Sequence, residues 1–154
     1  MRLDKRGLEG MPLKLLVGFL LIALMMPAVA DSLSAYQRGM AIGELGRAVR
    51  QVKSAAQSCF LSGPGNVRII DINASPRGNA IMQLGGARGS LEPPDITASL
   101  DGSTVVREHM LDPRITIVVD GGKPIALHFA HERLLLECVV DGSDVFVRAR
   151  VMPR

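Results

Sequence analysis

Residues 15–30 read LLVGFLLIALMMPAVA, a run without a charge, and this stretch decides the fold. It follows Lys14 and a basic cluster at Lys5 and Arg6, the arrangement of a membrane-targeting segment whose positive end stays in the cytoplasm. A membrane-spanning helix needs about 20 apolar residues and the apolar region of a cleaved signal peptide about 7 to 15, so this run lies between the two. We therefore expect residues 13–30 to contact a membrane and the rest of the chain to form an extracytoplasmic head.

One candidate cleavage site lies at the end of this run. Pro27 precedes Ala28, Val29 and Ala30, so small residues occupy the two positions that signal peptidase reads before a cut at Asp31. Cleavage there would release a soluble secreted domain. The same run without any cleavage would give a plain single-pass anchor.

A second candidate site lies before the run. Residues 5–16 read KRGLEGMPLKLL, and this stretch resembles the start of archaeal proteins with a class III, type IV prepilin-like signal peptide. In that family a basic pair and Gly precede the cut, and the hydrophobic helix follows it. The resemblance implies that a prepilin-type peptidase cuts between Lys5-Arg6-Gly7 and Leu8, which leaves the helix on the mature protein as an anchor.

The resemblance continues beyond the membrane segment. The stretch from 31 ends at Cys59-Phe60, and residues 62–68 read SGPGNVR, similar to the helix-to-strand junction of small archaeal pilin-like proteins. It implies an α+β fold in which a transmembrane helix continues into an amphipathic helix packed on a small antiparallel β-sheet head. Many pilins carry Glu at the fifth mature position, where it pairs with a neighbouring subunit; a cut after Gly7 puts Pro12 there and Glu9 at the second.

The stretch that follows the membrane run has the period of an amphipathic helix. Its apolar residues recur at steps of three and four and share one face, namely Ile42, Leu45, Val49, Val52, Ala56 and Cys59. Such a face needs a partner surface, either the protein's own sheet or the matching helix of another subunit. The first is favoured, because in the pilin-like plan this half of the helix lies on its own head.

From Gly63 onward, short β-branched runs separated by turn residues replace the helical period. We expect strands at residues 67–73, 80–84, 96–100, 104–109, 115–119, 125–129, 134–140 and 145–151. Three turn sequences, at residues 101–102, 120–122 and 141–143, combine Asp with Gly and predict three hairpins in an antiparallel meander.

Alternation along the last two runs predicts which residues face the core. Leu134, Leu136, Cys138 and Val140 share one face of their strand, and Val145, Val147, Ala149 and Val151 share one face of the next. If the helix packs there, Cys59 and Cys138 both approach the core. They are then either a candidate disulfide or two free buried thiols, and the sequence leaves both open.

Composition argues against a nucleic-acid partner. The formal net charge is +3, but residues 1–7 alone hold a surplus of +2, so the rest of the chain is close to neutral. Its arginines are scattered, without the interleaved aromatic residues that would make a phosphate-binding surface. Asn73-Ala74-Ser75 is a candidate N-glycosylation sequon, which has meaning only on the exported side of a membrane.

No pattern in the sequence predicts an active site. His128, His131 and Cys138, with Cys59, are the residue types that zinc prefers, but the two histidines are three apart at a strand end and face opposite sides. The chain has no Gly-x-Ser-x-Gly elbow, and Gly85–Gly89 fits neither phosphate-binding fingerprint. We expect no catalytic residue, no metal and no cofactor, and hence not an enzyme.

The sequence thus predicts four segments. Residues 1–7 are a class III leader, 8–30 a transmembrane and assembly helix, 31–62 an amphipathic helix and 63–154 the β-rich head. The expected function is structural, as a single-pass type IV pilin-like or pseudopilin-like surface protein that meets identical or related subunits through its N-terminal helix. The alternative is a secreted or membrane-anchored extracytoplasmic binding module, cleaved after Ala30 in its secreted form.

Overall fold

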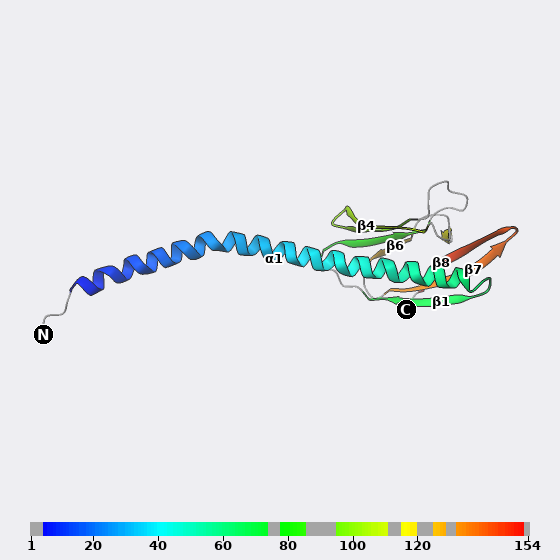
Figure 1. The fold of residues 1–154 in the computed structure, drawn as a ribbon, viewed down its shortest axis with the longest axis horizontal. Coiled ribbons are helices and arrows are strands. Elements are labelled where there is room, and N and C mark those ends of the chain that lie inside the picture. The colour runs from blue at the N-terminus through cyan, green and yellow to red at the C-terminus, as the bar shows by residue number, and fades with distance from the viewer. Residues whose placement is uncertain are drawn as a thin grey trace. The chain divides into compact units, whose positions relative to one another are not determined.

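The computed structural model describes residues 5–73, 78–85, 95–110, 115–119, 125–128 and 132–152, with side chains from residue 13 onward except at 128. One helix precedes the strands (Figure 1). The elements are α1 (Lys5–Leu61), β1 (Val67–Ile72), β2 (Ala80–Leu84), β3 (Asp95–Leu100), β4 (Ser103–His109), β5 (Ile117–Val119), β6 (Ile125–His128), β7 (Glu132–Asp141) and β8 (Asp144–Met152). The chain divides into two compact units, Met1–Arg38 and Gly39–Arg154.

The first unit contains the N-terminal part of α1. Its sequence is rich in Leu, Ala and Met, which lose little side-chain entropy in a helix, and this favours continuous helical structure. The helix passes through Pro27 without a break. The expected apolar N-terminal helix and its amphipathic continuation are both present, and together they form one 57-residue element.

The second unit contains two four-stranded sheets. Sheet A has the order β1-β7-β8-β5 and sheet B the order β4-β3-β2-β6. All pairs are antiparallel except β5 with β8, which are parallel. The expected α+β class is confirmed, but the single antiparallel sheet is corrected to two sheets, of which one is mixed.

Two of the three predicted hairpins are confirmed. β3 and β4 pair around Asp101 and Gly102, whose φ angles of 51° and 80° are those of a tight two-residue turn. β7 and β8 pair around Gly142, with φ 67°. In both turns the residue types allow the left-handed conformation that the reversal requires.

The third predicted hairpin, at residues 120–122, is wrong. β5 pairs with β8 in sheet A and β6 pairs with β2 in sheet B, so the two strands that flank this segment belong to different sheets. Turn residues allow the chain to change direction, but they do not decide which strands then pair. Ile117 and Val119 of β5 are buried beside β8, and this burial favours the long-range parallel pairing.

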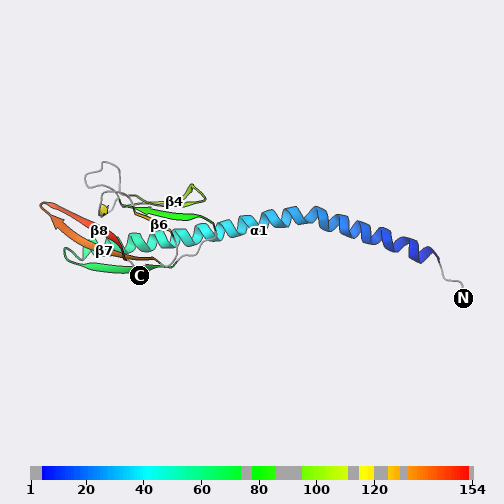
Figure 2. The ribbon, with the colours of Figure 1, turned by 180° about the vertical axis from the view of Figure 1, so that it is seen from behind.

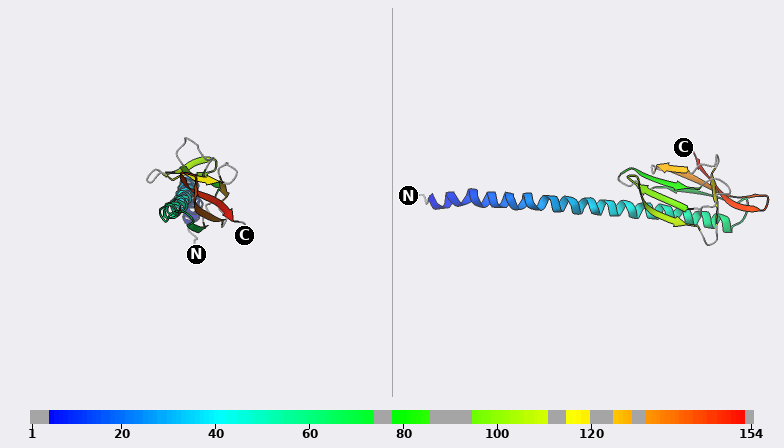
Figure 3. Two further views of the ribbon diagram at one scale, coloured as in Figure 1. Left: turned by 90° about the vertical axis from the view of Figure 1, so that its right-hand side faces the viewer. Right: turned by 90° about the horizontal axis from the view of Figure 1, so that it is seen from above.

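One hydrophobic core joins the C-terminal part of α1 to both sheets. Figures 1 and 2 show this part of α1 with β4 and β6 on one side and β1 on the other, and Figure 3 shows the region end-on and from above. The core includes Leu45, Val49, Val52 and Ala56 of α1, Ile72, Leu134, Leu136 and Val147 of sheet A, and Met82, Leu84, Ile96 and Leu127 of sheet B. The prediction that the amphipathic face packs on the protein's own head is therefore confirmed, with Ile42 only partly buried.

The predicted facing of the last two strands holds in their central parts. Leu134, Leu136 and Cys138 of β7 and Val147 and Ala149 of β8 are buried. Their predicted companions nearer the strand ends, Val140, Val145 and Val151, are exposed. The helix covers the middle of this face, where each large aliphatic side chain contributes about 1.5–3 kcal/mol by burial.

Candidate membrane anchor, processing site and cysteine pair

The N-terminal part of α1 exposes apolar side chains on every face. Apart from Gly18, each residue from 13 to 36 is exposed, and the large hydrophobic side chains between 13 and 29 are 48–71% accessible. A helix that is apolar all round is stable only when another apolar phase covers it, as in a membrane. In the described part of the chain, α1 is the one helix long and apolar enough to cross a membrane, and its most apolar 18-residue window has a mean hydropathy of 2.3.

Charged and aromatic residues mark the two ends of this segment. Lys14 precedes the uncharged run and Asp31 follows it. At the rise of an α-helix, the distance along the helix axis between these two residues is about 26 Å, slightly less than the roughly 30 Å thickness of a hydrocarbon core. A lysine at that position can extend its ammonium to the lipid headgroups. Leu33 and Tyr36, 54% and 65% exposed, lie just beyond Asp31, where an aromatic ring suits a membrane interface.

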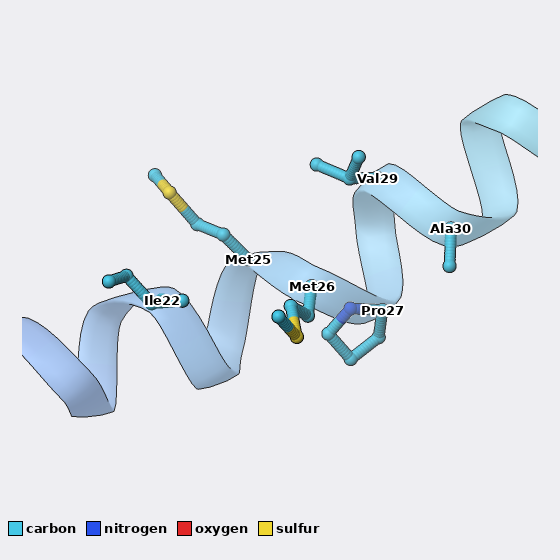
Figure 4. Close-up of a pocket in the computed structure, with 6 residues that line it drawn as sticks. All are labelled: Ile22, Met25, Met26, Pro27, Val29 and Ala30. Atoms are coloured by element: carbon cyan, nitrogen blue, oxygen red, sulfur yellow. The ribbon is translucent and has the colours of Figure 1, made fainter.

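An apolar hollow follows the helix around Pro27. Its volume is about 570 Å³, and it is lined by Ile22, Met25, Met26, Pro27, Val29 and Ala30, which project from consecutive turns (Figure 4). Proline has no N–H, so the carbonyl of Ala23 lacks its usual helical donor. The lining suits a lipid chain or the apolar face of a second helix, not a polar ligand.

The two candidate processing sites lie at different depths of α1. Lys5, Arg6, Gly7 and Leu8 are in the first turns of the helix, and their side chains lie outside the described set. Ala28, Ala30 and Asp31 are exposed positions in its interior. Both sites belong to the first unit.

The two cysteines meet at the end of α1. Both are buried and both are free thiols in the structure. The thiol of Cys59 donates to the carbonyl oxygen of Asn66 at 3.2 Å, and the backbone N–H of Cys138 donates to the same oxygen at 2.9 Å. The Cys59 thiol also lies 3.5 Å from the carbonyl oxygen of Leu136, two residues before Cys138 on β7.

Burial makes both thiols weak acids. It raises the pKa of Cys59, and the neighbouring Cys138 raises that pKa further. Burial also raises the pKa of the Cys138 thiol. The thiolate, which is the reactive form, is therefore disfavoured in the folded head.

The structure describes only some of the remaining predicted site residues. Asn73 is exposed at the end of β1, while Ala74 and Ser75 of the sequon lie outside the described residues, as does His131. Within the ranges that the structure describes, no three His, Cys, Asp or Glu residues are grouped as metal ligands would be.

Sequence reasoning missed the charged pairs of sheet B. His109 Nδ1 lies 2.6 Å from Asp95 Oδ1, and Arg107 lies 3.8 Å from the same carboxylate. Lys53 Nζ of α1 lies 2.7 Å from Glu108 Oε2 of β4. Counting residues outward from the Asp101-Gly102 turn would pair Asp95 with Glu108, and only the register shift between Ala98 and Ser99 brings His109 opposite Asp95. No local signal in the sequence joins Lys53 to Glu108.

The fold and the exposed helix define the class of this protein. It has a pilin-like α+β fold, in which one long apolar N-terminal helix is followed by a small β-rich region. Comparisons with protein-family models, with curated protein sequences and with solved structures find no match to this chain.

Proposed function

We propose that the protein is a membrane-anchored, type IV pilin-like structural subunit of a cell surface and not an enzyme. One observation carries the proposal: a single helix exposes apolar side chains on every face from residue 15 to 30, but buries only one face after residue 40. The first pattern requires a lipid or protein environment, and the second is that of a helix seated on its own head. The function is therefore to present the head outside the cytoplasm and to join it to other subunits.

The basic residues before the apolar run give the proposed orientation of the helix in the membrane. Lys5, Arg6 and Lys14 precede the apolar run, and basic residues are retained on the cytoplasmic side of a membrane. The head then lies outside. A prepilin-type peptidase, acting at Gly7 and Leu8, would remove the leader and keep the helix.

A seam along the exposed helix supports assembly with a second copy. Ile22, Met26, Val29, Leu33 and Tyr36 follow one another at alternating steps of four and three, the spacing of a helix–helix seam. Within residues 15–30 this spacing does not distinguish one face from another, because nearly every residue there is apolar. Leu33 and Tyr36 continue it past Asp31, where polar residues surround them, and this continuation favours a helical partner over lipid alone.

Cysteine crosslinking in membranes tests this assembly. We expect Leu33→Cys to give disulfide-linked dimers under mild oxidation, because the seam would place two copies of this position together. Ala35→Cys is the matched control: it lies two residues away and on nearly the opposite side of the helix. Equal crosslinking of both, or of neither, would contradict assembly through this seam and favour an anchored binding module.

Replacing residues 13–36, which include the whole seam, with an unrelated membrane-spanning helix separates anchoring from assembly. We expect the head to stay in the membrane fraction while its oligomers in mild detergent disappear. Oligomers that persist with the foreign helix would locate the subunit contact elsewhere.

A further inference from the structure

We infer that Cys59 and Cys138 form an intramolecular disulfide in the exported protein, which joins the last turn of α1 to β7. The inference rests on the export of the head, which is part of the proposed function. It goes beyond that function because it assigns a covalent link inside the head, between the C-terminal end of α1 and sheet A.

The placement of the two residues carries the inference. The thiol of Cys59 and the backbone N–H of Cys138 both donate to the carbonyl oxygen of Asn66. Cys59 further contacts the carbonyl oxygen of Leu136, which places its sulfur against the core-facing side of β7, where Cys138 is also buried. A disulfide needs Cα atoms within about 7 Å of each other. Because the Cys59 sulfur and the Cys138 nitrogen lie 3.2 Å and 2.9 Å from the same carbonyl oxygen, these two atoms are at most about 6 Å apart, which is compatible with a bridge.

The reaction balances by thiol–disulfide exchange. Cys59 and Cys138 each lose a proton, and together they lose two electrons as the S–S bond forms. A thiol oxidoreductase of the extracytoplasmic space that carries a disulfide accepts both electrons and both protons and becomes a dithiol. In vitro, glutathione disulfide accepts them and becomes two molecules of glutathione.

The burial of both thiols predicts when the bond forms. The raised pKa values leave little thiolate in the folded head, so exchange there is slow and oxidation must precede or accompany closure of the core. The same burial protects the finished bond. We expect dithiothreitol to reduce it at least about tenfold more slowly in the folded protein than in denaturant.

Thiol trapping on the full chain tests the inference. Cells of the native host are quenched in acid, and the thiols are blocked with N-ethylmaleimide in denaturant before the intact mass is measured. We expect no maleimide on either cysteine, and two maleimides only after prior reduction. Two maleimides without reduction would overturn the inference.

Protease treatment of intact cells shows independently whether the head is exported, so the failure of the disulfide can be distinguished from the failure of the proposed function. A digested head with two blocked thiols would overturn the disulfide and leave the anchored topology standing. A protected head would contradict that topology, and refolding of the reduced chain with glutathione disulfide then decides the pairing. A monomer lighter by the mass of two hydrogen atoms supports it, whereas a chain that keeps both thiols after refolding overturns it.

Thermal unfolding gives a second readout. The bond closes a long loop, from residue 59 to 138, so its reduction should lower the Tm by about 10 °C or more. The control is the Cys59→Ala/Cys138→Ala double variant, whose Tm should not respond to reductant. A wild-type Tm that does not change on reduction would contradict a stabilising link.

Discussion

At the scale of single residues, the ion pair between Lys53 and Glu108 joins α1 to sheet B. The two groups are 2.7 Å apart, and each side chain is a little over a quarter exposed. The hydrogen bond from Lys53 holds the pKa of Glu108 below its usual range. We expect Glu108→Gln to lower the free energy of unfolding by about 0.5–1 kcal/mol at pH 7, measured by chemical denaturation.

The pH dependence follows from the lowered pKa. The stabilisation is fully present above the pKa of an unfolded glutamate, about 4.3, and is lost as the pH falls through the lower folded value. The difference between wild type and Glu108→Gln should therefore vanish in acid. Asp71→Asn is the matched control, because the Asp71–Arg133 pair is more than half exposed and should contribute less. Equal losses for both variants would contradict this account.

Gly85 lies so close to β5 that its backbone leaves no room for a Cβ atom. Its φ is +76°, and a Cβ there would lie 2.5 Å from Val119 Cγ2 and 3.1 Å from the carbonyl oxygen of Ile117. Val is stiff and the carbonyl belongs to β5, so neither can move cheaply. We expect Gly85→Ala to destabilise the head by about 2–4 kcal/mol in denaturant titrations.

Gly142 provides the comparison for Gly85. It has a similar φ of +67° but open space around the position of a Cβ, so Gly142→Ala should cost only about 1 kcal/mol of conformational strain. If the two variants lose the same stability, the close approach of β5 to Gly85 is wrong.

At the scale of elements, the seating of α1 on the head depends on its buried face. Leu45 is fully buried among both sheets, so Leu45→Ala should cost about 2–5 kcal/mol. Leu61, on the same helix, is 73% exposed, and Leu61→Ala should change stability by less than about 0.5 kcal/mol. Thermal unfolding of the two variants checks this pair, and similar Tm values would contradict the assigned face.

Most of these elements could be predicted from local sequence. The three- and four-residue steps from Leu45 to Cys59 reflect burial on one side of a helix, and the alternation from Leu134 to Cys138 reflects burial on one side of a strand. The Asp-Gly turns at 101–102 and 141–142 predict two hairpins because they join strands that are neighbours in sequence.

The remaining pairings could not be predicted because they depend on contacts between distant parts of the chain. The parallel pairing of Ile117 with Val147 and the division into two sheets arise from burial around α1, which has no signature in a short window. The same holds for Lys53 and Glu108. The adjacency of Cys59 and Cys138, by contrast, follows once the helix packs on β7. The apolar face of the helix and the alternating apolar residues of β7 both predicted that packing.

At the scale of the whole molecule, the core of the second unit begins at Ala41. A chain that lacks residues 1–38 should therefore fold without detergent. We expect its Tm to lie within a few degrees of that of the full chain in mild detergent, because the core contains no residue from the described part of the removed segment. An insoluble or unfolded product, checked by circular dichroism and gel filtration, would contradict the independence of the head.

The central claim is that the apolar helix stays on the mature protein as its anchor. The N-terminal sequence and intact mass of the protein from membranes of its native host test it most directly. The account predicts a chain that begins at Leu8 and keeps α1. A chain that begins at Asp31 would contradict the anchor altogether, and one that begins at Met1 would contradict prepilin-type processing.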